Sequence, residues 1–142
     1  MASFGKAVQR GFLRSAVWLY RRSNGRIAGT MRGAPVLLLS TAGRRSGRTW
    51  TTPLIYQPDG DRFVLIASNA GAPKHPGWWL NLRRNPEATI QVGPETIPVT
   101  RSAVTGPERD RLWSLMTKVY PGYDDYQQKT SRTIPVVLLE RR

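Results

Sequence analysis

Two arginines and a serine stand between glycines in residues 43–48, Gly-Arg-Arg-Ser-Gly-Arg. Glycine lets the backbone turn tightly, so that consecutive N–H groups can converge on an anion. The planar forks of Arg44 and Arg45 match the oxygens of phosphate or carboxylate, and Ser46 adds a hydroxyl donor. The segment therefore predicts an anion-binding turn, with an ordinary charged hairpin turn as the alternative.

Residues 67–82 combine small residues with two neighbouring tryptophans. Small residues let a flat ring approach the backbone, where amide donors can bond its carbonyl and ring nitrogen atoms. Trp78 and Trp79 either line such a site or anchor the core, and at least one is expected in the core because adjacent helical positions face different directions. His75 is an acid–base candidate, with a solvated loop histidine as the preferred interpretation.

Three tyrosines lie close together in residues 120–126, Tyr-Pro-Gly-Tyr-Asp-Asp-Tyr. Tyr123 and Tyr126 are three residues apart, so they can share one helical face. Each offers an apolar ring and a hydroxyl that can grip an aromatic substrate and donate a hydrogen bond. The alternative is a packed aromatic cluster.

Composition limits the chemistry that these segments can perform. The 142 residues contain no cysteine and one histidine, and only nine residues are acidic. Thiolate chemistry and disulfides are excluded, and no metal site is expected, so catalysis must use an organic cofactor or Ser, Tyr and Arg side chains. The formal charge of +13 attracts anions, which leaves nucleic acid, an acidic membrane surface or a polyanionic small molecule as partners.

Residues 4–22 predict an amphipathic helix. Phe4, Val8, Phe12, Ala16 and Leu19 form its apolar sector, and Lys6, Arg10, Arg14 and Arg21 form a basic stripe. Such a helix suits an anionic membrane interface, and it equally suits packing on its own domain with a solvated basic face. No signal peptide and no run of roughly 18 apolar residues is found, so a cytoplasmic protein is expected.

The remaining pattern predicts an α+β domain, a small antiparallel β-barrel over residues 25–142 that follows an arm at residues 1–24. Residues 49–57 and 62–67 are expected to form a hairpin around Pro58-Asp59-Gly60. Further strands are expected at 36–39, 88–93, 95–104 and 134–139, and a short helix at 76–84. Thr105-Gly106-Pro107-Glu108 predicts a capping box that starts another helix.

In combination, three segments resemble the deazaflavin-dependent nitroreductase family of actinobacteria, over about residues 18–140. The segments are TAGRRSG, ASN-AGAPKHPGWWLNLRRNP and YPGYDDYQQKTSRTIPVVLLE. The resemblance implies a split β-barrel of the flavin-binding type and the coenzyme F420. It also implies hydride transfer from the reduced deazaflavin to a quinone, an activated alkene or a nitroaromatic. The phosphate and oligoglutamate tail of F420 would account for the positive charge.

The resemblance also implies a set of site residues. Those expected to bind the cofactor are Arg44, Arg45, Ser46, Trp50, Thr51, Thr52, Pro53, Leu54, Ile55, Ile66, Ala67, Ser68, Asn69, Lys74, Gly77, Trp78, Trp79, Leu80, Asn81 and Tyr123. Tyr120, Tyr123 and Tyr126 match the tyrosines on the substrate side, and Tyr123, Tyr126 or Ser68 would polarise or protonate the acceptor. Trp50 and Asn69 stand where the family's nitroreductase representative has an arginine and a lysine, and Arg48 and Lys74 are candidates to compensate.

Two other functions remain open from the sequence. The same barrel can serve an FMN-dependent oxidoreductase, and a basic β-barrel can bind nucleic acid with aromatic residues stacked on the bases. The clustering of the aromatic residues near Gly-rich loops, without an RNP signature, favours the F420 enzyme, so no nucleic acid is expected. A small-molecule electron acceptor and a peripheral contact with an anionic membrane are the expected partners.

Overall fold

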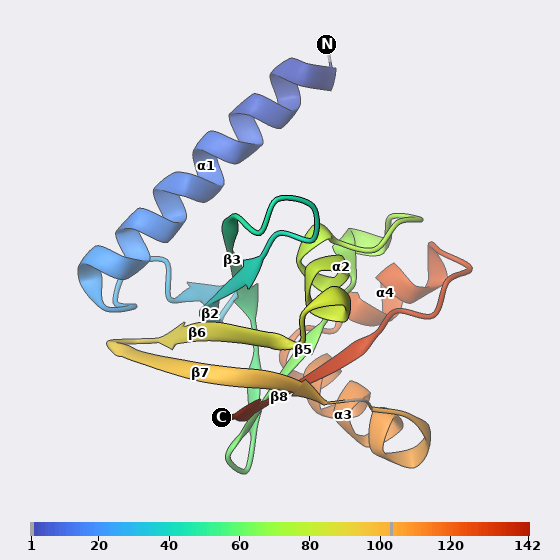
Figure 1. Ribbon diagram of the computed structural model, residues 1–142. Helices are drawn as coiled ribbons and strands as arrows, with labels where there is room; N and C mark the ends of the chain where they lie inside the picture. Colours follow the sequence, from blue (N-terminus) through green and yellow to red (C-terminus); the bar gives the residue numbers. More distant parts are fainter. Residues whose placement is uncertain (1, 103) are drawn as a thin grey trace.

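The computed structural model describes residues 2–102 and 104–142, and side chains from residue 13 onward within that range. A curled antiparallel sheet carries helices on both faces (Figure 1). In chain order the elements are α1 (Ala2–Ser23), β1 (Thr30–Met31), β2 (Ala34–Ala42), β3 (Thr49–Ile55), β4 (Gln57–Asp59), β5 (Arg62–Ile66), the 3₁₀ turn η1 (Asn69–Gly71), α2 (Gly77–Arg84), β6 (Glu87–Val92), β7 (Glu95–Ser102), α3 (Gly106–Val119), α4 (Gly122–Gln128) and β8 (Val136–Arg141). None of the described helices has the length and apolarity needed to cross a membrane.

The sheet follows the order β1-β2-β6-β7-β8-β5-β4, and β3 pairs separately with β2. Side chains alternate between the two faces of a strand, and β2, β5 and β8 are buried on both faces over most of their length. Val36 and Leu38 of β2 join a core with α1, α3 and α4, whereas Leu37 and Leu39 join a second core with α2. The near-continuous apolar runs in β2, β5 and β8 follow from this double coverage.

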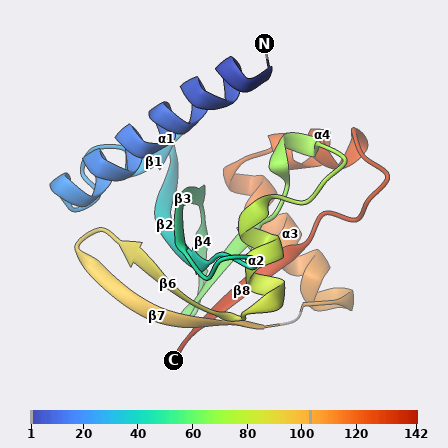
Figure 2. The same ribbon diagram turned by 45° about the horizontal axis from the view of Figure 1, so that its top comes forward.

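The last turns of α1 are anchored on the sheet by Tyr20. Its side chain is 1% exposed, and its hydroxyl accepts a hydrogen bond from Gly93 N (2.8 Å) and donates one to Gln91 O (3.2 Å). The helix expected at residues 4–22 is confirmed, and its N-terminal half extends beyond the sheet (Figures 1 and 2). The predicted positions Phe4, Lys6, Val8, Arg10 and Phe12 lie outside the described side chains. The division of the chain at residue 24 stays a prediction.

The hairpin predicted from residues 49–57 and 62–67 is wrong for most of its length. β3 pairs with β2 through the turn at 43–48, and only Gln57–Asp59 (β4) pairs with β5. The chain changes partner at Tyr56, whose N–H donates to Pro35 O. The glycine turn brings β3 to one edge of β2, while β5 takes β8 as its long partner.

The predicted capping box at α3 is also wrong. Thr105 is the N-cap residue, but its side chain makes no capping hydrogen bond. Glu108 instead forms ion pairs with Arg62 and Arg111. These charge-assisted contacts replace the reciprocal contact that a capping box requires.

The segment between β5 and α2 meets α4 at one end of the sheet. Figure 1 shows α2 and α4 on the same side of the molecule, next to the end of β5. Gly71 of η1 packs on α4 so closely that a Cβ atom there would lie 2.9 Å from Tyr126 O. Its φ of +79° also favours glycine, so close approach and backbone conformation select the same residue.

Candidate functional site

The turn at residues 43–48 is tight and presents its polar side chains to solvent. Gly43 N donates to Arg48 O (2.7 Å), and Gly47 N donates to Gly43 O (2.8 Å). Arg44, Arg45 and Ser46 are all exposed. The guanidinium group of Arg45, the remaining donors of Arg44 and the Ser46 hydroxyl can therefore meet an oxyanion.

The side chain of Asn81, in α2, holds this turn in place by hydrogen bonds. Its side chain is 5% exposed, and Oδ1 accepts from both the backbone N (3.1 Å) and Nη1 (3.0 Å) of Arg44. Its Nδ2 donates to Thr41 Oγ1 (3.1 Å). Because its oxygen is taken up by Arg44, Asn81 positions the turn rather than offering that oxygen to a ligand.

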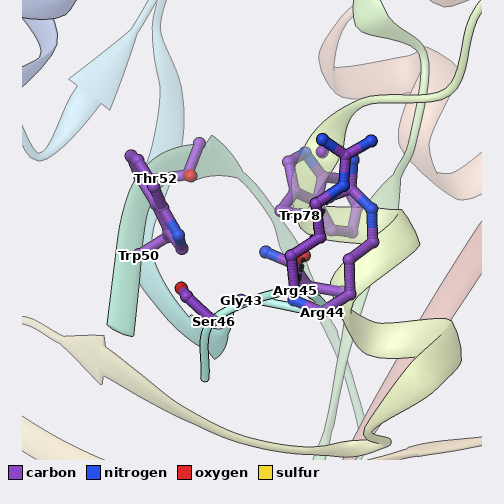
Figure 3. A pocket seen from close by; sticks show the side chains of 9 residues that line it. Gly43, Arg44, Arg45, Ser46, Trp50, Thr52 and Trp78 are labelled. Carbon is purple, nitrogen blue, oxygen red and sulfur yellow. Dashed lines mark hydrogen bonds between the residues drawn. The ribbon is translucent and has the colours of Figure 1, made fainter. Parts of the chain in front are cut away.

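A cavity of about 420 Å³ opens beside the turn, and we call it the arginine cavity. It is lined by Gly43, Arg44, Arg45, Ser46, Trp50, Thr52, Gly77, Trp78 and Asn81. Figure 3 shows Trp50 across the opening from Arg44 and Arg45, with Trp78 behind them. The cavity combines cationic groups with indole surface, an arrangement that suits an anion attached to a flat ring.

A second cavity of about 180 Å³ lies further along β3, and we call it the tyrosine cavity. It is lined by Met31, Pro53, Leu54, Ile55, Ile66, Ser68, Ala70, Tyr120, Tyr123 and Tyr126. Its walls come from β3, from the segment after β5 and from α4. Apolar side chains surround a few hydroxyls, as in sites that hold an aromatic ring.

The three tyrosines form one packed group with distinct roles for their hydroxyls. Tyr120 and Tyr126 share a hydrogen bond at 2.7 Å, and the Tyr120 and Tyr123 rings meet edge to face at 4.9 Å. No other described residue is hydrogen-bonded to the Tyr123 hydroxyl, and no buried side-chain oxygen or nitrogen lacks a partner in the described part of the chain. The Tyr123 hydroxyl therefore reaches open space. Burial raises the pKa of Tyr123 well above its usual value, which keeps the hydroxyl protonated.

A missed residue, Arg132, organises the segment between β5 and α2. Its guanidinium contacts three backbone carbonyls of residues 67–72 and lies 3.1 Å from His75 Nδ1. His75 lies in a loop as expected, but it is half-buried and contacts Arg132 rather than solvent alone. Burial, with Arg132 and Arg83 nearby, lowers the pKa of His75. Nothing in the spacing around Arg132 could have revealed this contact, because the segment it holds lies about sixty residues earlier.

The structure brings most of the predicted site residues to these two cavities, but not all of them. Those that line neither cavity are Thr51, Ala67, Asn69, Lys74, Trp79 and Leu80. Thr51 instead bonds Arg21 and Ser40, and the Asn69 amide donates to Lys74 O (3.0 Å). Trp78 is a buried member of the second core and also lines the arginine cavity, whereas Trp79 is partly buried and packs against that core under Arg101. The expectation that at least one tryptophan anchors the core is confirmed.

The curled sheet with helices at its faces and ends defines an α+β protein of the split β-barrel class. A solved structure of an F420-H2 dependent reductase (FDR-A) superimposes with a TM-score of 0.69 at 37% identity, covering 75% of this chain and 94% of that one. A solved domain-swapped dimer superimposes with a TM-score of 0.72 at 32% identity, covering 89% and 95%.

The sequence comparisons name the family. Residues 12–141 match the family model of F420H(2)-dependent quinone reductase, and the chain belongs to this family. The F420H(2)-dependent quinone reductase Rv1261c of Mycobacterium tuberculosis is 44% identical over 128 residues, which cover 87% of this chain and 86% of that protein. The chain is thus an F420-dependent oxidoreductase, and F420 rather than FMN is its cofactor.

The residues present fit this cofactor. F420 carries a flat deazaflavin, a phosphate and an anionic tail. The arginine cavity offers exposed guanidinium groups beside indole rings, and β3 leads from it to the tyrosine cavity. A third cavity of about 450 Å³, between α1 and β3, shares Trp50 and Thr52 with the arginine cavity and adds the cations Arg14, Arg21 and Arg48.

Proposed function

We propose that this protein reduces a quinone with a hydride from reduced F420, and that the two cavities along β3 hold the two reactants. The observation that carries the proposal is their arrangement: a cationic, indole-lined cavity and a tyrosine-lined cavity share one strand as their floor. Bound F420 supplies the hydride, which is two electrons and one proton. A quinone that accepts it needs one further proton to become the hydroquinone.

The residues of this chain would bind, orient and donate protons. Arg44, Arg45 and Ser46 would hold the phosphate, and the basic groove between α1 and β3 would take the anionic tail. Pro53–Ile55 and Ile66–Ser68, at the tyrosine cavity, would lie beside the edge of the deazaflavin ring that meets the quinone. Holding the reactants in contact can lower a barrier by roughly 7–11 kcal/mol, so positioning is the main contribution.

Proton donation would come from the tyrosine cavity. The Tyr123 hydroxyl is protonated and reaches open space, and the Tyr120–Tyr126 hydrogen bond supplies a second donor. Ser68 lines the same cavity and is the remaining candidate. Each can stabilise charge as it develops on the acceptor oxygen.

The deciding experiment is a titration of the purified protein with oxidised F420 and, in parallel, with FMN. Trp50 and Trp78 line the arginine cavity, so a bound ring should quench tryptophan fluorescence. We expect saturable quenching by F420 only, and then oxidation of reduced F420 by a water-soluble quinone. Binding of F420 without quinone turnover would refute quinone as the electron acceptor, and activated alkenes and nitroaromatics would then be assayed.

The salt dependence of F420 binding tests the phosphate site. In the double variant Arg44→Gln/Arg45→Gln we expect weaker binding and a flatter dependence on salt, because two cations no longer attract the anion. Arg83→Gln/Arg84→Gln removes two exposed cations outside both cavities and serves as the matched control. An unaltered salt slope in the Arg44/Arg45 variant would argue against this site.

We also propose that α1 meets an anionic membrane surface, where a lipid-soluble quinone resides. Trp18 is 60% exposed and Arg22 lies over its ring, so an aromatic anchor and a cation are presented together. Deleting residues 1–22 would also remove the buried Tyr20, so point variants are cleaner. Vesicle flotation should recover less Trp18→Ser/Arg22→Ser protein than wild type, and equal recovery would reject the membrane contact.

A further inference from the structure

The segment of residues 67–75, which joins β5 to α2, is held by one side chain from the far end of the chain. Arg132 lies between α4 and β8 and is half-buried. Its guanidinium donates to three carbonyl oxygens of the segment: Ser68 O from Nη2 (2.7 Å), Ala72 O from Nε (2.9 Å) and Ala67 O from Nη1 (3.3 Å). The planar fork spreads its donors over Nε, Nη1 and Nη2, which suits three acceptors at separate positions.

The fourth contact of this guanidinium depends on the protonation state of His75. Arg132 Nη1 lies 3.1 Å from His75 Nδ1. A guanidinium only donates, so Nδ1 must accept and the ring must be neutral with its proton on Nε2. The charged groups around His75 are Arg132, Arg83 of α2 and the adjacent Lys74, and all three are cations. Protonation of His75 would therefore turn an attractive contact into a repulsive one.

Arg132 differs from the arginines that form ion pairs on the surface. Among the described side chains, the ion pairs involve Arg62, Arg111, Arg141 and Arg142, and none of them includes Arg132. Burial lowers the pKa of Arg132, and among the described side chains no carboxylate lies within ion-pair distance of it. A partly buried cation that contacts only neutral dipoles carries a desolvation cost. In this protein the same contacts hold the 67–75 segment in place.

That segment and α4 are two walls of the tyrosine cavity. Ser68 and Ala70 line the cavity from the segment, and Tyr123 and Tyr126 line it from α4. Arg132 is tied to α4 as well, because Gln127 Nε2 donates to Arg132 O (2.8 Å). One residue thus connects both walls.

We propose that Arg132 is a positioning residue that fixes the 67–75 segment against α4, with neutral His75 as its partner, so that the tyrosine cavity loosens when His75 is protonated. The inference deepens the proposed function, on which it rests for the identity of the molecules in the cavity. The segment, the clamp and the titration themselves are properties of the cofactor-free protein.

The first test uses cofactor-free protein and the fact that His75 is the only histidine in the chain. Its ring gives a single set of imidazole resonances in NMR, so its pKa can be measured directly. We expect a pKa below 6.5 in wild type and a rise toward 6.5 in Arg132→Gln. Protection of the 67–75 amides against hydrogen exchange should fall in Arg132→Gln and also in Arg132→Lys, since lysine keeps the charge but lacks the fork.

Arg109→Lys is the matched control, because Arg109 is another half-buried arginine that donates to a carbonyl, Ile134 O (2.7 Å), outside the segment. It should leave the His75 pKa and the protection of residues 67–75 unchanged. Full protection in Arg132→Lys, or an unshifted His75 pKa in Arg132→Gln, would overturn the proposal. If Arg132→Gln does not fold, wild type still decides: amide protection in the segment must fall as pH drops through the measured His75 pKa.

The second test asks whether the fixed segment matters for binding. Suppose that in Arg132→Lys the 67–75 segment is correctly arranged for about one tenth of the time. The Kd for F420 or the KM for the quinone should then rise roughly tenfold in this variant, and neither should change in Arg109→Lys. The same loss should occur in wild type when pH is lowered through the His75 pKa. Unchanged binding and KM in Arg132→Lys would overturn the positioning role. If wild-type protein binds no F420, the proposed function fails while the first test still decides the clamp.

Discussion

The hydroxyls of Tyr120 and Tyr126 share one hydrogen bond, so one of them donates to its neighbour and the other keeps its proton free for a third group. Hydrogen bonding to Tyr126, followed by burial, raises the pKa of Tyr120. Tyr120 is therefore neutral near pH 7 and can act as a proton donor in the tyrosine cavity.

We expect Tyr123→Phe and Tyr126→Phe to lower kcat for quinone reduction, because each removes a proton donor while keeping the ring. A positioned donor typically contributes about 10²-fold, so a loss near that size is expected in the more important of the two. Steady-state kinetics with reduced F420 and a soluble quinone would measure it. Tyr56→Phe, which lies outside both cavities, is the control. If both cavity variants kept the kcat and KM of wild type, the tyrosines would have no role in the reaction.

Asn81 gives a second prediction at the level of single residues. Asn81→Leu keeps a similar volume but removes the acceptor shared by Arg44 N and Nη1. We expect F420 binding to weaken roughly tenfold, because hydrogen bonds to charged groups contribute about 1.5–3 kcal/mol. Fluorescence titration measures the affinity. Among the described residues the Asn85 side chain bonds only Glu87 N, so Asn85→Ala should bind F420 like wild type. Equal affinities in the two variants would rule out the anchoring role of Asn81.

Among the elements, α1 depends on one buried hydroxyl for its attachment to the β6–β7 turn. Tyr20→Phe would leave Gly93 N and Gln91 O without this partner. A buried polar group without a partner costs about 1–3 kcal/mol, so the free energy of unfolding should fall by that amount in denaturant titrations. Tyr56→Phe removes a half-buried hydroxyl that bonds no other described residue and should change it by less than about 0.5 kcal/mol. A loss of the same size in both variants would mean that the hydrogen bonds of Tyr20 are unimportant.

The elements themselves could largely be predicted from the sequence, whereas their partners could not. Periodicity located α1, α2, β6, β7 and β8 because helix and strand repeats are local properties. The pairing of β3 was missed because residues 49–57 carry no signal that distinguishes β2 from β5 as a neighbour. Pairing is decided by edges that become available only when the sheet assembles.

The candidate site shows the same division. Residue types were enough to predict the turn at 43–48, Trp78 and the tyrosines, because arginine, indole and phenol groups have characteristic binding chemistry. The roles of Arg132 and Asn81 could not be predicted, because the groups to which they are hydrogen-bonded lie far away in the sequence. Residue types do not show which hydrogen-bond donors are already used within the protein.

For the whole molecule, His75 predicts how stability depends on pH. Its pKa is lowered in the folded protein, so the unfolded chain binds the proton more readily. Stability is therefore complete above the ordinary histidine pKa near 6.5 and is lost as pH falls from there through the folded value. The Tm should decrease between pH 7 and pH 5 in wild type and stay nearly flat in His75→Gln, which has no histidine left. A decrease of equal size in both would assign the effect to other groups.

Asp59 affects the stability of the protein in a lower pH range than His75. Its hydrogen bonds to Arg111 and then Arg62 hold its pKa at about 2, so it adds stability above pH 3.8 that is lost only as pH falls toward 2. The two groups therefore predict two separate steps in an acid titration of Tm, one from His75 and a later one that Asp59→Asn should diminish.

The position of β8 in the sheet has a consequence for biosynthesis. β8, residues Val136–Arg141, pairs with β5 on one side and β7 on the other, so it is the strand that joins the two halves of the sheet. A ribosome makes it after every other element described here. Until then β5 and β7 each expose an unpaired edge, and such edges template association with other chains. Nascent chains that stall before residue 136 should therefore need chaperone protection, because the two halves of the sheet are not yet joined.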